Sequence, residues 1–160
     1  MPNLQCPHAQ FAGKKMPGAN LQEAYMQEGD LTQVDLSKAN LKKANLFHAK
    51  LMGGNFSGAD MTNITLFNAD LTGANLSGAN LTDAKLSNAN LAEVNLTDAN
   101  LMGAEIDGAM FVRATFCRTT MPNGIMNSSN CPVERSAAVD GDVPVKNQPV
   151  VQELPKAKRK

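Results

Sequence analysis

Few side chains in this sequence are of the types that catalyse reactions or bind metals. The 160 residues include two histidines, His8 and His48, and three cysteines. Cys6 and His8 could both coordinate a metal ion, yet a specific zinc site needs three or four ligands at characteristic spacing. The sequence contains no phosphate-binding loop and no dinucleotide fingerprint. It therefore predicts no catalytic, cofactor-binding or metal-binding residues, and a protein that is not an enzyme.

Asparagine and aspartate are abundant, and paired carboxylates could in principle do acid–base chemistry. Such a pair needs an environment that raises the pKa of one member. Here the Asn and Asp residues recur at a fixed interval, as in Asp60, Asp70, Asn75 and Asn80. A repeat that requires them for its structure accounts for them, so we interpret them as structural residues.

A large apolar residue occupies every fifth position over most of the chain. The series begins at Phe11, ends at Met121 and has no exception among its 23 positions. Self-similarity at a fixed period is the signature of a repeat architecture. Residues 11–121 are therefore expected to form a solenoid in which this column lies in the core.

The other positions of the repeat support an extended, turning chain. Alanine usually stands two residues before the large residue, which gives the consensus Ala-(Asn/Asp)-Leu-x-x, as in Ala74 to Gly78. Side chains two apart in an extended segment share a face, so both columns point inward. Because five is odd, the chain must turn once per repeat to keep every leucine inside. Glycine, Asn and Asp, which tolerate positive φ, gather at the last position of the repeat.

A helix cannot have this pattern, because leucines five apart lie about 140° apart around a helix and form no apolar face. The residues instead resemble the pentapeptide-repeat family. The resemblance implies an all-β fold, a right-handed quadrilateral β-helix with four repeats per coil and about six coils. At a strand spacing of about 4.8 Å the rod would be about 27 Å long. The glycine spacing by itself fits three repeats per coil about as well as four.

The ends of the repeat define the expected domain organisation. We expect a lead-in or cap at 1–10, the β-helix at 11–121, a C-terminal cap at 122–131 and a disordered tail at 132–160. The closing segment resembles that of family members whose end is bracketed by cysteines. This resemblance and the turn signature at 121–124 predict a disulfide between Cys117 and Cys131, although two thiols packed in a cap remain an alternative.

Composition limits the partners and the compartment that we expect for the protein. Fifteen basic and 15 acidic residues give a net charge of zero, so no strong field recruits nucleic acid or a membrane surface. No stretch approaches the roughly 20 apolar residues of a membrane span, and the start lacks the pattern of a secretory signal. A cytoplasmic location is the default expectation, whereas a Cys117–Cys131 bond would indicate an oxidising compartment.

Two groups of outward residues depart from the polar pattern. Phe47 and Phe67 lie 20 residues apart, so four repeats per coil would stack them on one face, and Met52 lies nearby in sequence. Exposed apolar groups can mark an interface, although isolated surface rings are also common. The second group is a mild basic cluster, for which a solvated face is the simpler interpretation. Its members are Lys38, Lys42, Lys43 and Lys50.

The sequence favours a structural or protein-interaction module, with a partner that it does not identify. The alternative is a modulator of DNA gyrase of the quinolone-resistance type. The resemblance implies it, because the quinolone-resistance members of the pentapeptide-repeat family present an acidic rod that mimics DNA. Residues 11–121 carry 11 acids and 9 bases, a net charge of −2. Duplex DNA carries one negative charge per roughly 1.7 Å, so this charge argues against the alternative.

Overall fold

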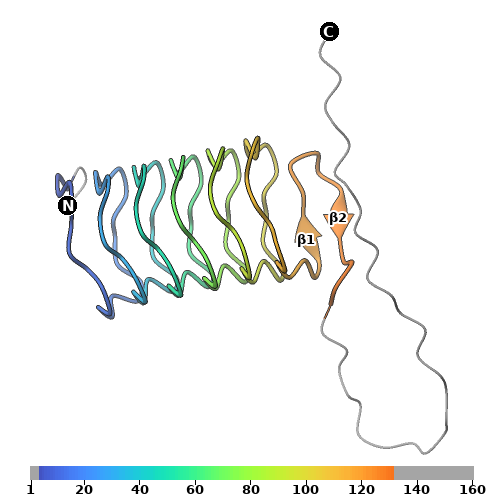
Figure 1. The fold of residues 1–160 in the computed structure, drawn as a ribbon, viewed down its shortest axis with the longest axis horizontal. Coiled ribbons are helices and arrows are strands. Elements are labelled where there is room, and N and C mark those ends of the chain that lie inside the picture. Colours follow the sequence, from blue (N-terminus) through green and yellow to red (C-terminus); the bar gives the residue numbers. More distant parts are fainter. Residues whose placement is uncertain (1–3, 132–160) are drawn as a thin grey trace, which may run out of the picture.

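The chain forms a right-handed, four-sided β-helix, seen in a computed structural model that describes residues 4–131. Twenty parallel bridges connect the coils, and each joins a residue to the residue 20 positions later, from Gln5 with Tyr25 to Asn100 with Thr120. This offset equals four five-residue repeats, so the coil is square and not triangular. The six coils stack along one axis from the N-terminal end to the C-terminal hairpin (Figure 1).

Backbone hydrogen bonds between coils satisfy the polar groups that burial would otherwise strand. Each leucine of the apolar column donates its N–H to a carbonyl 19 residues later, as Leu31 does to Lys50 at 2.8 Å. The Asn or Asp position donates in the opposite direction, as Asn80 does to the carbonyl of Ala59. Every coil is therefore bonded to both of its neighbours, which explains how such short sides can be stable.

The corners are four-residue turns that begin at the apolar column. In the repeat from Leu71, the N–H of Ala74 donates to the carbonyl of Leu71 at 2.9 Å, and Gly73 at the third position has φ of +67°. Type II turns require positive φ at this position. The prediction that the last position of the repeat holds the turn is thus confirmed. Ten further positions at positive φ carry residues other than Gly, Asn or Asp, such as Lys43 and Glu93.

The Asn and Asp side chains hold these corners in place. Their Oδ1 atoms accept from the N–H two residues later, as Asn75 does from Ser77 and Asp60 from Thr62. This is the Asx-turn that makes these residues common at turns. In several coils the Asn side chain also donates to the coil before, as Asn90 does to the hydroxyl of Thr72. The structural role inferred from the sequence is therefore visible in the hydrogen bonds.

The Asp60 corner should make stability sensitive to acid. Burial raises the pKa of Asp60, but hydrogen bonds from Thr62 and Lys42 outweigh it and hold the pKa below the ordinary value of 3.8. A carboxyl with a lowered folded pKa stabilises the protein above its unfolded pKa, and that contribution is lost as the pH falls through the folded value. Asp60→Asn keeps the turn acceptor without titrating, as Asn80 does in the next coil.

We therefore expect the free energy of unfolding of the wild type to fall more steeply below about pH 4 than that of Asp60→Asn. Urea denaturation at a series of pH values between 2 and 7 measures this difference. Parallel acid limbs for the two proteins would contradict the assigned role of Asp60. Asp70→Asn is the matched control. Asp70 occupies the same repeat position and accepts from Thr72, but within residues 4–131 it has no ion pair like that of Asp60 with Lys42.

The core consists of the two inward columns. The large residues from Leu31 to Leu101 and the small residues from Ala24 to Ala99 are almost fully buried. Within this fully buried range, one repeat departs from the consensus in both columns, because Gly54 and Phe56 replace Ala and Leu. A Cβ atom added to Gly54 would lie 2.6 Å from the ring of Phe56. The glycine therefore makes room for the larger ring.

This compensation can be tested with a double-mutant cycle. Gly54→Ala should lower the free energy of unfolding by about 1–3 kcal/mol through overpacking. The same substitution in a Phe56→Leu background should cost much less, because that pair restores the consensus repeat. Chemical denaturation of the four proteins gives the coupling energy. If the two substitutions are additive, Gly54 and Phe56 do not compensate each other.

The N-terminal and C-terminal ends of the rod are built differently. The sequence predicted a lead-in or cap at 1–10, and in the structure Gln5 and Gln10 already bridge to Tyr25 and Asp30, so coiling begins before Phe11. At the other end, strand β1 (Thr119–Thr120) pairs in antiparallel fashion with β2 (Met126–Asn127), and this hairpin begins the C-terminal cap. The tail predicted at 132–160 lies outside the described residues.

Candidate interaction surface

Two aromatic rings stack on one corner of the rod. Phe47 and Phe67 occupy the second position of their turns, one coil apart, and the N–H of His48 donates to the carbonyl of Phe67. Their ring centroids lie 5.8 Å apart with an interplanar angle of 6°. Both side chains are half-buried. The four-fold coil thus brings together the two rings that the sequence singled out.

Polar groups surround the ring pair on one side. The rings of His48 and Phe47 are arranged edge to face, with their centroids 4.3 Å apart. The Nε2 atom of His48 lies 3.0 Å from the side-chain amide nitrogen of Asn68. A shallow depression beside them is lined by Glu28, Phe47, His48 and Lys50. The patch therefore combines an apolar centre with hydrogen-bonding groups and both signs of charge, as is typical of protein-interaction surfaces.

Met52 lies on the next corner of the coil and not beside the rings in the same column. It occupies the second turn position of its own repeat, where Thr32 and Thr72 stand in the adjacent coils. Its side chain is 37% exposed. The structure places Met52 one side of the square away from Phe47, so we keep only Phe47 and Phe67 with their polar neighbours in the candidate surface.

The lysine cluster is divided among different positions of the square. Lys42 pairs with Asp60 of the next coil at 3.0 Å. Lys50 lies at the depression beside Phe47, and Lys38 and Lys43 occupy turn positions with positive φ. The four lysines therefore do not form one continuous basic site.

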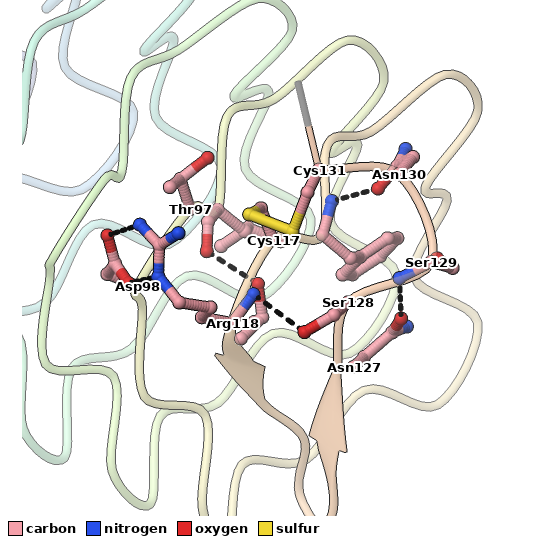
Figure 2. The surroundings of a disulfide bond; sticks show 12 residues. Thr97, Asp98, Cys117, Arg118, Asn127, Ser128, Ser129, Asn130 and Cys131 are labelled. Atoms are coloured by element: carbon pink, nitrogen blue, oxygen red, sulfur yellow. Dashed lines mark hydrogen bonds and ion pairs between the residues drawn. A yellow bond between two sulfur atoms is a disulfide. The ribbon is translucent and has the colours of Figure 1, made fainter. Parts of the chain in front are cut away.

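A disulfide and a bidentate ion pair secure the C-terminal cap (Figure 2). The sulfur atoms of Cys117 and Cys131 are bonded, and their Cα atoms lie 4.4 Å apart, inside the limit of about 7 Å for such a bond. Arg118 donates through Nε and a terminal nitrogen to the two carboxylate oxygens of Asp98. Ser128 and Asn130 accept from the backbone N–H groups of Arg118 and Phe116.

Sequence reasoning missed a group of exposed apolar side chains near this end of the rod. They are at least half exposed and lie in the last coil or in the cap hairpin; the members are Met102, Met110, Val112, Ile125 and Met126. A break in the periodic polar pattern was available as a signal, because Met102 and Val112 stand where Thr and Ser are usual. Only the fold shows that these residues gather at one end.

The described residues include no group of three or more His, Cys, Asp or Glu side chains that could hold a metal ion. Cys6 is a free thiol near the N-terminal end of the rod, and His8 pairs with Glu28 at 3.7 Å. Between Leu4 and Cys131 there is also no helix long and apolar enough to cross a membrane.

The repeat matches a known family over most of the chain. The family described as pentapeptide repeats (8 copies) matches residues 16–53, 44–83 and 79–118. Since the match covers more than half of the sequence, this chain belongs to the pentapeptide-repeat family. No curated protein sequence gives a significant match.

Solved structures of pentapeptide-repeat proteins are among those that this chain matches. Rfr23 from the cyanobacterium Cyanothece is 27% identical, with a TM-score of 0.56, over 67% of this chain and 90% of that one. HetL from the cyanobacterium Nostoc, a protein involved in heterocyst differentiation regulation, is 28% identical, with a TM-score of 0.49, over 78% and 68%. A protein of the Arabidopsis thaliana thylakoid lumen is 33% identical, with a TM-score of 0.34, over 68% and 66%.

Proposed function

We propose that this protein is a non-enzymatic interaction module that contacts a protein partner through the corner built on Phe47 and Phe67. The observation that carries the proposal is the stacked pair of half-buried rings on an otherwise polar wall. In the same column the neighbouring coils carry Gln27 and Ser87, so the fold does not require aromatic residues here. Aromatic side chains are enriched at interface centres and often carry much of the binding energy.

The charge of the rod supports a protein partner over the DNA-mimic alternative. A net charge of −2 over residues 11–121 is far below that of a DNA segment of comparable length. Three of the nine basic residues in 11–121 also form ion pairs within the rod, among them Arg113 with Glu93 and Arg118 with Asp98. We expect no inhibition or protection of gyrase in a supercoiling assay.

The double variant Phe47→Ser/Phe67→Ser tests the proposed surface, because Ser87 shows that this corner accepts serine. Tagged wild type and variant are used to capture proteins from an extract of the source organism. We expect a partner that the wild type retains and the variant loses, with a loss of affinity of at least tenfold when the purified partner is titrated.

Met102→Ser is the matched control, since it removes an exposed apolar side chain from the same turn position on another corner. This variant should retain the partner. If the Phe variant binds the partner as the wild type does, the ring pair is not the contact surface. If the Met102→Ser variant loses it equally, the contact is at the C-terminal end of the rod.

A further inference from the structure

Two of the four sides of the last coil have no further strand beyond them in the part of the chain that the structure describes. These uncovered sides comprise residues 104–113. In the earlier coils the equivalent N–H groups donate to the next coil, as Leu86 does to the carbonyl of Glu105. On the uncovered sides four N–H groups have no acceptor among residues 4–131: those of Ile106, Gly108, Phe111 and Arg113.

The C-terminal hairpin lies on the other two sides of the rod end (Figure 1). Strand β2 lies beside β1, and Asn130 bonds to the carbonyls of Phe116 and Ala114 on the adjoining side. Neighbouring strands are about 4.8 Å apart, so these raised sides stand one strand higher than the uncovered sides. The described end of the rod is therefore a step, raised on two sides and recessed on two.

The outer edge of β2 carries backbone groups that can bond to another strand. Thr120 directs its N–H and its carbonyl to the preceding coil, where they bond to Ala99 and Leu101. In an antiparallel pair, two opposite residues either bond to each other or both point their backbone groups away from each other. Met126 lies opposite Thr120, so the N–H and the carbonyl of Met126 point away from β1, beyond the end of the rod.

We propose that this end of the rod joins the same end of a second copy of the chain, in a two-fold symmetric dimer. The two-fold axis crosses the rod through the two corners at which a raised side meets an uncovered side, near Gly103 and near Val112. Rotation about this axis places the raised sides of each copy on the uncovered sides of the other. A two-fold interface uses one patch twice and must be complementary to itself, and a half-raised step meets that condition.

The position of the axis determines which strands meet. It exchanges the side of Thr120 with the side of Glu105, so β2 of the second copy lies over residues 104–106. The rotation makes β1 of the second copy antiparallel to residues 104–106. Because β2 is antiparallel to β1, β2 of the second copy runs parallel to residues 104–106, as each coil of the rod does to the coil before it.

This register gives Met126 of the second copy the place that a residue of a further coil would have. It stands over Glu105, with its carbonyl facing the N–H of Ile106 and its N–H facing the carbonyl of Ala104. The same pattern joins the earlier coils, because the carbonyl of Glu105 itself accepts from the N–H of Leu86. The dimer contains this short parallel ladder twice, once at each copy of β2.

Apolar side chains lie on both halves of the step. Ile125 and Met126 on the raised sides are 65% and 63% exposed, and Met110 and Val112 on the uncovered sides are 51% and 60% exposed. Contact with a second copy removes part of this surface from water, which stabilises the association. An uncovered strand edge is a template for pairing with another chain, and solenoids need capped ends.

The charges of the two halves are complementary. The carboxylates of Glu105 and Asp107 on the uncovered sides form no ion pair within residues 4–131. The rotation places the corner of Asp107 opposite the corner that carries the guanidinium of Arg118, which bonds to Asp98. Residues 119–131 have no charged side chain, so the hairpin of the second copy brings no carboxylate to the acidic sides.

The N-terminal end of the rod offers no such match. The first coil presents four successive sides, from Gln5 to Asn20, so a head-to-tail stack could bring it onto the uncovered sides only by displacing the hairpin. The dimer is also independent of the surface proposed for a protein partner. The nearer ring of that surface, Phe67, lies two coils before Asp107 in the same column and stays outside the dimer contact.

Sedimentation equilibrium of the full-length protein tests the dimer, in a Cys6→Ser background that prevents bonding through the free thiol. The mass of this parent protein should rise with concentration from one chain toward two. Val112→Asp places two carboxylates near each other at the axis and should raise the dissociation constant at least tenfold. Met52→Asp is the matched control, since Met52 has the same turn position on the same corner three coils earlier and should leave the constant unchanged.

Cross-linking tests the register of the two copies. Glu105→Cys and Met126→Cys are made as separate full-length variants in the same background, and they are mixed with a short bismaleimide. The mixture should give a linked heterodimer, because these two positions meet only between copies. In the control mixture Thr65→Cys replaces Glu105→Cys. Thr65 lies in the same column two coils earlier, so this variant should not link to Met126→Cys.

Three results would overturn the proposal. One is the mass of a single chain at every concentration up to about 1 mM. The second is an equal dissociation constant for the parent and for Val112→Asp, which would place the association on another surface. The third is association without a link between Glu105→Cys and Met126→Cys, and masses beyond two chains would then indicate head-to-tail stacking.

Discussion

Leu76→Asp should lower the free energy of unfolding by at least about 4 kcal/mol, or prevent folding. Leu76 is fully buried in the middle of the rod. The substitution removes roughly 1.5–3 kcal/mol of apolar burial and forces a carboxylate among leucines and alanines, where no partner offsets the loss of its hydration. The backbone N–H of Leu76 bonds to the carbonyl of Asn95 in the coil after it, so a distortion that accommodates the carboxylate would also strain the contact between coils.

Denaturation monitored by far-ultraviolet circular dichroism measures this effect. Ser77→Asp is the matched control, since it places the same charge one residue later on the outer face and should change stability by less than about 1 kcal/mol. Leu76→Ala is the fallback if the aspartate variant cannot be purified, and it should cost about 2–5 kcal/mol. Equal stabilities of the wild type and either Leu76 variant would show that the column does not face the interior.

Breaking the Cys117–Cys131 bond should have the second-largest effect and lower the free energy of unfolding by up to about 3 kcal/mol. The bond closes a loop of 14 residues, for which chain entropy gives a value of that size. Little else anchors the segment after β1 by apolar burial, because Ile125 and Met126 are largely exposed. Without the bond, the cap depends on the β1–β2 pairing and on a few hydrogen bonds, such as the one that Ser128 accepts from the N–H of Arg118 and the one that Asn130 donates to the carbonyl of Ala114.

Cys131→Ser and reduction of the wild type should give the same loss of stability in chemical denaturation. Cys6→Ser is the control, since Cys6 is a free thiol near the N-terminal end and should have little effect. Unchanged stability after complete reduction would show that the hydrogen bonds alone hold the cap. A requirement for the bond would in turn support an oxidising compartment for this protein over the cytoplasmic default, because cytosolic thiols are kept reduced.

The fold could be read almost completely from the sequence because the repeat is a local rule that every unit obeys. The inward columns, the turn at the last repeat position and the structural role of the Asn and Asp residues each follow from the alternation of an extended chain and the backbone freedom of its corner residues. What the residues left open was the number of sides. Glycine spacing fitted three or four repeats per coil, and the bridges between residues 20 apart decide for four.

The candidate surface depends on the number of repeats per coil. Phe47 and Phe67 stack only because 20 residues return the chain to the same corner, and the same geometry places Met52 on a different one. The sequence also did not show that the exposed apolar residues gather at one end of the rod. Ile106 and Phe111 obey the repeat as well as any core residue, yet they remain partly exposed because the hairpin covers only the neighbouring sides. Periodicity fixes which residues face inward, whereas burial at an end depends on what packs against it, and that is a property of the tertiary structure.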